Sequence, residues 1–172
     1  MSPSAHSAVF PGRFTSRVAE PMVLFLIGMR LNRLWKVWKW LPVAAAMPKM
    51  MRELETDPDL GLIHSQGALL PRGPVLIQYW RSFEHLERFA HSKLMPHLSA
   101  WGAFNRKVGA SGDVGIWHET YLVQPGGAES IYTNMPRFGL AAATEHLPAT
   151  GAHERARQRL QPPSAARGTE AG

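Results

Sequence analysis

Apolar residues follow two kinds of pattern along this chain, and the order of the patterns predicts a mixed α and β structure. Short runs rich in β-branched and aromatic residues predict strands at 22–29, 60–66, 75–80 and 113–123. Apolar residues spaced three and four apart instead predict helices at 43–55 and 82–94. Turn-forming Pro, Gly and Asp residues separate these segments.

This order is that of the ferredoxin-like βαββαβ arrangement, an α+β fold with two helices on one face of a four-stranded antiparallel sheet. The strands are apolar on both faces, so the uncovered face needs a partner, and a second copy of the chain is the simplest one. We therefore expect a ferredoxin-like domain at 21–146 that forms a homodimer. An N-terminal arm at 1–20 and a flexible C-terminal tail at 147–172 complete the expected organisation.

The strand predicted at 113–123 carries polar groups on both of its faces. Alternation along a strand places His118 on one face and Trp117, Glu119 and Tyr121 on the other. A strand that is apolar on both faces is usually covered on both, so we expect these polar groups to be partly buried. Glu119 then needs a partner, for which Lys or Arg is the expected type, whereas Trp117 and Tyr121 are more often core residues.

The composition excludes several kinds of chemistry. The 172 residues include no cysteine, which excludes disulfides, thiolate metal sites and cysteine nucleophiles. The net charge of +6 is scattered along the chain without a recognition motif, so we expect no nucleic-acid partner. No pair of histidines four residues apart joins a carboxylate on one clear helix, so no metal site is predicted.

Nothing in the sequence predicts a membrane span or a signal peptide, and we expect a cytoplasmic protein. Trp35 and Trp38 alternate with Lys36 and Lys39. This pattern suits either a helix that docks on a lipid surface or a helix that covers the sheet with its lysine stems extended towards water. We expect the second arrangement, and therefore no membrane partner.

Several motifs together resemble a monooxygenase-like family allied to the antibiotic-biosynthesis monooxygenases. The resemblance covers roughly residues 22–144, and its motifs are Tyr79-Trp80-Arg81-Ser82, then Leu86, Phe89, Ala90, His97 and Trp101, then Gly115 to Tyr121, Ile131 to Pro136, and Phe138-Gly139-Leu140. Members of this family occur near secondary-metabolite genes. The resemblance implies a dimeric α+β barrel, in which the open sheet faces of two protomers pack and each protomer keeps a cavity between its sheet and its helices.

The resemblance leaves the reaction open. The wider superfamily includes cofactor-independent oxygenases, haem-degrading enzymes, aldoxime dehydratases with haem, isomerases and cyclases, so the fold alone does not fix the chemistry. The spacing of Trp80, Ser82 and His97 is loosely similar to that of haem-degrading members, in which a helical histidine binds iron. Pro96 directly precedes His97 here, which departs from that pattern.

The candidate site residues follow from side-chain chemistry and from the resemblance. His118 suits a general base, a proton shuttle or an iron ligand, because histidine titrates near neutral pH; the alternative is a core histidine bonded to a backbone carbonyl. His97 is either a ligand beside Trp101 or a helix-end residue that faces water, and His64 is a further cavity candidate. The catalytic candidates are His118, His97 and Glu119, and the substrate-binding candidates are Trp80, Trp101, Trp117, Tyr121 and Asn134.

Asn134 has two interpretations, since its amide suits either a substrate carbonyl or the cap of a helix after Pro136, and we expect the cap. Three functions remain. The leading one is a monooxygenase-like oxidoreductase of secondary metabolism that acts on a hydrophobic small molecule without a cofactor. The second is a haem enzyme of the same fold with His97 or His118 as axial ligand. The third is a non-catalytic dimeric binding protein.

Overall fold

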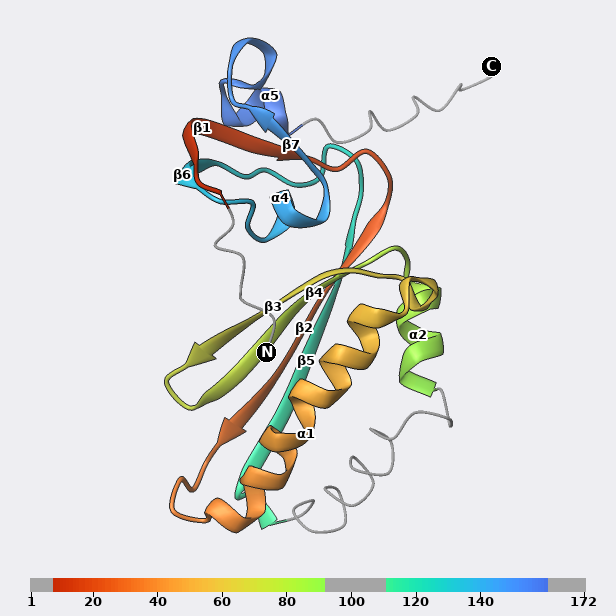
Figure 1. Ribbon diagram of the computed structural model, residues 1–172, viewed down its shortest axis with the longest axis vertical. Helices are drawn as coiled ribbons and strands as arrows, with labels where there is room; N and C mark the ends of the chain where they lie inside the picture. The colour runs from red at the N-terminus through yellow and green to blue at the C-terminus, as the bar shows by residue number, and fades with distance from the viewer. Residues whose placement is uncertain (1–7, 92–110, 161–172) are drawn as a thin grey trace, which may run out of the picture. The chain divides into compact units, whose positions relative to one another are not determined.

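The computed structural model describes residues 8–91 and 111–160 (Figure 1). The chain divides into two compact units. The larger unit is residues 23–121, and the smaller one combines residues 1–22 with 122–172.

The larger unit has the predicted ferredoxin-like organisation. Its sheet contains β2 (Met22–Leu31), β3 (Leu62–Leu70), β4 (Gly73–Trp80) and β5 (Val114–Val123), in the order β3-β4-β2-β5. The helices α1 (Val37–Thr56) and α2 (Phe83–His91) pack on one face of the sheet, and the 3-10 turn η1 (Pro58–Leu60) follows α1. The antiparallel pairings of β2 with β4 and of β3 with β4 confirm the fold class expected from the sequence.

The core between sheet and helices has two clusters. At one end, Val23 and Trp80 of the sheet meet Leu54 of α1 and Leu86 of α2, and all four are buried. At the other end, Met29, Leu31 and Val114 meet the half-buried Trp40 and Ile116. Each fully buried apolar side chain of this size stabilises the fold by about 1.5–3 kcal/mol. Both helices therefore lie on the same face of the sheet.

Two helix boundaries show how packing and capping act here. The sequence pattern predicted a helix that starts at residue 43, after Pro42, but α1 continues through this proline from Val37 to Thr56. Proline removes one backbone donor, and the contacts that Trp40 and Leu54 make with the sheet hold the helix on both sides of that gap. The N-terminus of α2 is capped, because Ser82 Oγ accepts a hydrogen bond from the backbone N–H of His85 at 3.4 Å.

The smaller unit corrects the expected arm and tail. β1 (Phe10–Arg17) lies between β6 (Tyr132–Met135) and β7 (Glu145–Pro148) in a three-stranded antiparallel sheet. Short helical segments complete the unit, namely α4 (Leu140–Ala143), η3 (Gly151–His153) and α5 (Ala156–Arg159). Residues 10–17 therefore form a central strand, and 145–160 have regular structure. The sequence does not show which segments pair here, because each strand is short and its partners lie more than 100 residues away.

Candidate functional site

One row of side chains crosses all four strands of the larger sheet on the face that the helices cover. Ser65 of β3 is paired with Gln78 of β4, and Gln78 is paired with Phe25 of β2. The ring of Phe25 lies 5.7 Å from the ring of His118 on β5, measured between centroids. Phe25 and Gln78 both contact the core between sheet and helices, which places the row on the covered face. The row thus combines a hydroxyl, an amide, a phenyl ring and an imidazole.

Gln78 is the buried polar group of this row, with 2% of its surface exposed. Its Oε1 accepts a hydrogen bond from the indole N–H of Trp80 at 3.1 Å. Its Nε2 donates to the thioether sulfur of Met51 at 3.5 Å, and Ser65 Oγ donates to the same sulfur at 3.9 Å. A thioether is a weak acceptor, so both donors keep capacity for a stronger one. A ligand oxygen in this part of the core would supply it.

His118 lies on the covered face but is exposed in the single chain, together with Glu119, Thr120 and Tyr121. We expected the polar groups of this strand to be partly buried, and in the single chain His118, Glu119 and Tyr121 are exposed. β5 is an edge strand with β2 as its neighbour, and its buried contacts are confined to its first residues, such as Val114. An exposed imidazole at the end of the row can meet both a ligand and water.

The opposite face of β5 carries the other predicted polar groups, as strand alternation required. Tyr121 donates a hydrogen bond of 2.6 Å to Glu119 Oε2. The expected ion pair of Glu119 with Lys or Arg does not form among the described residues. The carboxylate raises the pKa of Tyr121, because ionising the phenol would place two negative charges side by side.

Trp117, on the same face as Glu119, is half-buried over Gly28. A Cβ atom on Gly28 would come within 2.6 Å of three indole atoms, so the glycine makes room for this ring. Tyr121 is 48% exposed and therefore is not the core residue expected. This tyrosine and its neighbour Glu119 are separated from His118 by the sheet itself.

His64 lies on the uncovered face. Its ring stacks on that of Tyr79 with centroids 6.1 Å apart. Leu62 and His64 would share one face of a regular strand, but the register shifts between them. That irregularity leaves Leu62 against the core and turns His64 away from it.

The other candidates have different outcomes. Trp80 is fully buried, with 0% of its surface exposed, so it is a core residue whose N–H binds Gln78. His97 and Trp101 lie outside the described residues. Asn134 belongs to the smaller unit and has a positive φ of 53°. Its Oδ1 accepts a 2.9 Å hydrogen bond from the backbone N–H of Gly12, and α4 is instead capped by Gly139, so the expected helix cap is wrong.

Asp113 is the strongest electrostatic centre of the larger unit, and sequence reasoning missed it. Its carboxylate is 2% exposed and forms ion pairs with Lys36 and Lys39, the first at 2.9 Å, and with Arg33 Nε at 3.3 Å. Its backbone carbonyl accepts from Asn32 and Arg33. The hydrogen bonds from Lys39 and Lys36 hold the pKa of this carboxyl well below its usual range. The cluster fastens the start of α1 to the start of β5.

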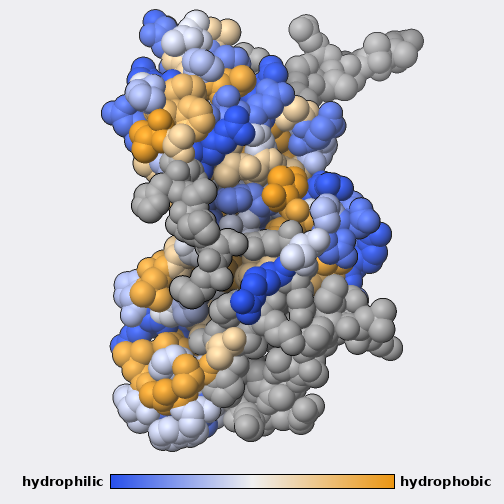
Figure 2. All heavy atoms as spheres, viewed as in Figure 1, coloured by the Kyte–Doolittle hydropathy of each residue, from blue (hydrophilic) through white to orange (hydrophobic). Residues whose placement is uncertain are grey.

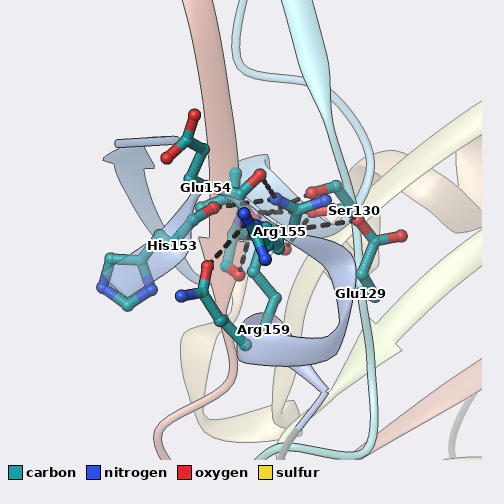
Figure 3. A network of polar contacts seen from close by, with 9 residues as sticks. Glu129, Ser130, His153, Glu154, Arg155 and Arg159 are labelled. Atoms are coloured by element: carbon teal, nitrogen blue, oxygen red, sulfur yellow. Dashed lines mark hydrogen bonds and ion pairs between the residues drawn. The ribbon is translucent and has the colours of Figure 1, made fainter. Parts of the chain in front are cut away.

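The smaller unit contains a pocket of about 390 Å³, lined by residues of the β1 strand, the 125–128 loop and α5. The main charged group in its wall is Arg159, of which 6% is exposed (Figure 3). Its guanidinium binds Glu129 and donates to the carbonyls of His153 and Glu154 at 2.7 and 2.8 Å. These contacts satisfy the arginine internally, so the pocket offers little free charge to a ligand.

Within residues 8–91 and 111–160, no group of three or more His, Asp or Glu side chains is arranged to hold a metal ion. In the same part of the chain, no helix is long and apolar enough to cross a membrane.

Gln78 and Ser65 were also not predicted from the sequence as site residues. The signal for Gln78 was available, because an amide interrupts the apolar run Val75 to Trp80.

The comparisons with known proteins agree with this fold. The family model described as Monooxygenase af470-like matches residues 22–140. Monooxygenase af470 of Aspergillus fumigatus is 30% identical over 140 residues, which are 74% of this chain and 50% of that protein. The chain therefore spans about half the length of this relative.

Two crystal structures of aldoxime dehydratase share the fold. The first, of OxdRE in complex with butyraldoxime, has a TM-score of 0.62 and 17% identity, and the match covers 82% of this chain and 42% of that one. The second has a TM-score of 0.60 and 19% identity, and it covers 79% of this chain and 42% of the other.

Proposed function

Because the chain belongs to the Monooxygenase af470-like family, we propose that it is a monooxygenase that oxidises a hydrophobic small molecule of secondary metabolism on the helix-covered face of its larger sheet. The observation that carries the proposal is the row from Ser65 to His118. It places a proton acceptor, an aromatic wall and two hydrogen-bond donors on one face of the sheet.

In the proposed reaction, His118 Nε2 or Nδ1 removes a proton from an acidic C–H of an electron-rich substrate. The resulting carbanion reduces dioxygen, and a hydroperoxide forms when the proton returns. Loss of water from the hydroperoxide leaves a ketone, so that a CH₂ group and O₂ become a carbonyl and H₂O. Dioxygen is the oxidant, and the protein supplies the base and the orientation of the substrate.

Gln78 and Ser65 are the proposed substrate-orienting groups. Both donate to the sulfur of Met51, and a phenol or ketone oxygen is a stronger acceptor than a thioether. Phe25 lies between these donors and His118, where it would stack on a planar substrate. In this arrangement the substrate's polar end is held at one end of the row and its reacting carbon lies beside the imidazole.

The uncovered face of the sheet is the proposed homodimer interface. Trp117, Tyr121 and His64 all lie on it, so in this proposal Trp117 and Tyr121 contact the second protomer. Glu119 lies on that face beside Tyr121, on the opposite side of the sheet from the row. The proposed base is therefore His118 and not Glu119. Such an enzyme fits a cytoplasmic setting.

A haem enzyme is the second candidate. His118 would hold the iron of a haem, since one imidazole suffices as its protein ligand and this one is exposed on the covered face. Bound haem would supply oxygen activation or dehydration at iron. In that case Phe25 would pack beside the ligating ring, and Gln78 would still orient the substrate.

The experiment is oxygen consumption by the purified protein with anthrone, a planar hydrophobic probe that has an acidic CH₂ group and a ketone. The proposal predicts protein-dependent uptake of one O₂ for each anthraquinone formed, unchanged by added hemin. Uptake that requires hemin, with a Soret band that saturates at one haem per chain, would favour the second candidate. No uptake with either preparation would count against both for this class of substrate.

A further inference from the structure

Five large apolar side chains lie exposed where α1 begins. This Trp patch consists of Leu34, Trp35, Val37, Trp38 and Leu41, each between 42% and 68% exposed, with both tryptophans at 68%. Figure 2 shows hydrophobic side chains gathered at the surface near this end of α1. Large apolar groups grouped in this way mark a surface that meets an apolar partner.

The direction of these side chains follows from contacts on the other side of the helix. Lys36 and Lys39 reach inward to the buried Asp113, and Trp40 packs on the core and donates its N–H to the Leu34 carbonyl at 3.1 Å. With those three residues facing inward, Trp35 and Trp38 face water. The sequence predicted a helix that covers the sheet with its lysine side chains extended towards water. In the structure, Lys36 and Lys39 instead point inward to Asp113.

The charge around the Trp patch is mainly positive. Between Glu20 and Glu53 the chain contains six Lys or Arg and no Asp or Glu. Arg30 is exposed, and the side chain of Arg33 is 54% exposed beside the patch. Asp113 neutralises only part of this charge, since it faces Arg33, Lys36 and Lys39 together.

We propose that the Trp patch docks this protein on an anionic lipid surface. Tryptophan prefers the interface between headgroups and acyl chains, where its ring is buried and its N–H stays hydrated. Apolar side chains on a helix with neighbouring Lys and Arg are the combination that lies in the plane of such an interface. The positive charge selects an anionic surface over a protein partner of neutral character. The surface is separate from the row that contains His118, so this inference does not depend on the proposed reaction.

The test is co-sedimentation of the full chain with vesicles. One set contains phosphatidylcholine alone and the other also contains about one third phosphatidylserine. The proposal predicts roughly tenfold more protein bound to the anionic vesicles, and loss of that excess at about 0.5 M salt, where charges are screened. The variant Trp35→Ala/Trp38→Ala is expected to lose at least tenfold in binding.

The matched control is Leu69→Ala/Leu122→Ala, which removes two side chains that are 82% and 68% exposed elsewhere. It should bind the vesicles as the original protein does. Arg30→Glu provides a second variant that keeps both tryptophans and should weaken binding to anionic vesicles only. Circular dichroism verifies that each variant is folded.

Three results would overturn the proposal. These are no sedimentation with either vesicle set, unchanged sedimentation of the tryptophan variant, and equal loss in the leucine control. A fourth result would also overturn it. In that case no protein binds to vesicles, and the molar mass in solution, measured by light scattering without vesicles, is lower for the tryptophan variant than for the original protein. That result would assign the Trp patch to a contact between protein chains.

Discussion

Tyr121 donates a 2.6 Å hydrogen bond to Glu119 from two positions further along β5, on the face of the sheet that the helices leave open. Glu119 is thus engaged by a neutral phenol. The hydrogen bond and the negative charge of the carboxylate together raise the pKa of Tyr121.

Replacing Glu119 by Gln should bring the pKa of Tyr121 down towards its ordinary value, because the amide carries no charge. The measurement is the ultraviolet titration of tyrosine, in which one of the chain's three tyrosines should ionise at lower pH than before. Oxidation of anthrone should be retained in Glu119→Gln, because the sheet separates this pair from His118. Loss of turnover with the fold intact would return Glu119 to the catalytic residues.

The features predicted correctly from the sequence depend on residues that are close together along the chain. Alternation along β5 correctly separated His118 from Glu119, and periodic apolar residues found both helices of the larger unit. These properties are local, since the side-chain period of a strand or helix is fixed by its own backbone.

What the sequence did not yield depends on pairing between distant segments. The irregularity between Leu62 and His64 moves His64 to the other face, and no residue type announces it. The position of Gln78 opposite Phe25 depends on the register of β4 against β2. In the sequence, Asp113 is the first residue of a predicted strand. Its ion pairs were not predicted, because its three cationic partners lie more than 70 residues earlier in the chain.

Asp113→Asn should destabilise the larger unit, because it leaves Lys36 and Lys39 close together without a counter-charge. We expect the melting temperature at pH 7 to fall by roughly 5 °C. Glu145→Gln breaks the exposed pair with Arg17 and serves as the control, with an expected change of no more than about 1 °C.

The same carboxylate gives a pH dependence of defined sign. The folded state lowers the pKa of Asp113, so its contribution to stability is complete above the unfolded pKa, near 4, and is lost as the pH falls towards the lower folded value. Urea unfolding of the original protein should therefore show a decline below about pH 4 that is smaller in Asp113→Asn. Equal slopes in both proteins would contradict this account of the cluster.

Gln78→Leu tests the proposed orientation of the substrate. It should raise the KM for anthrone by roughly tenfold with a smaller change in kcat, as expected for a lost hydrogen bond. The protein should also lose about 1–3 kcal/mol of stability, because the buried N–H of Trp80 loses its acceptor. Gln66→Leu, on the other face, is the matched control and should leave KM unchanged. Parallel effects in both variants would remove Gln78 from the site.

His146 in β7 should destabilise the smaller unit on acidification. Its Nε2 is buried without a hydrogen-bond partner among the described residues, and its ring stacks on Phe14 at 4.6 Å. Burial, and then the charge of Arg137, lower the pKa of this imidazole. Its stabilising contribution is therefore complete above the unfolded pKa of about 6.5 and is lost as the pH falls.

The measurement for His146 is its imidazole titration by nuclear magnetic resonance, assigned with His146→Phe. The midpoint should lie below the usual value for histidine. Arg137→Ala should raise it, since a nearby positive charge is removed. A midpoint above the usual value would show that the ring is charged in the fold and that its environment is different from the one described.

The rate of oxygen uptake with anthrone in His118→Ala, compared with His91→Ala, tests general-base catalysis by His118. His91 is exposed on α2 and its Nδ1 bonds to the Glu87 carbonyl of its own helix, so it controls for the loss of a surface imidazole. The account predicts that His118→Ala lowers uptake by about 10²–10⁴-fold, the usual contribution of a general base, with melting temperature unchanged. Uptake in His118→Ala equal to that in His91→Ala would contradict it.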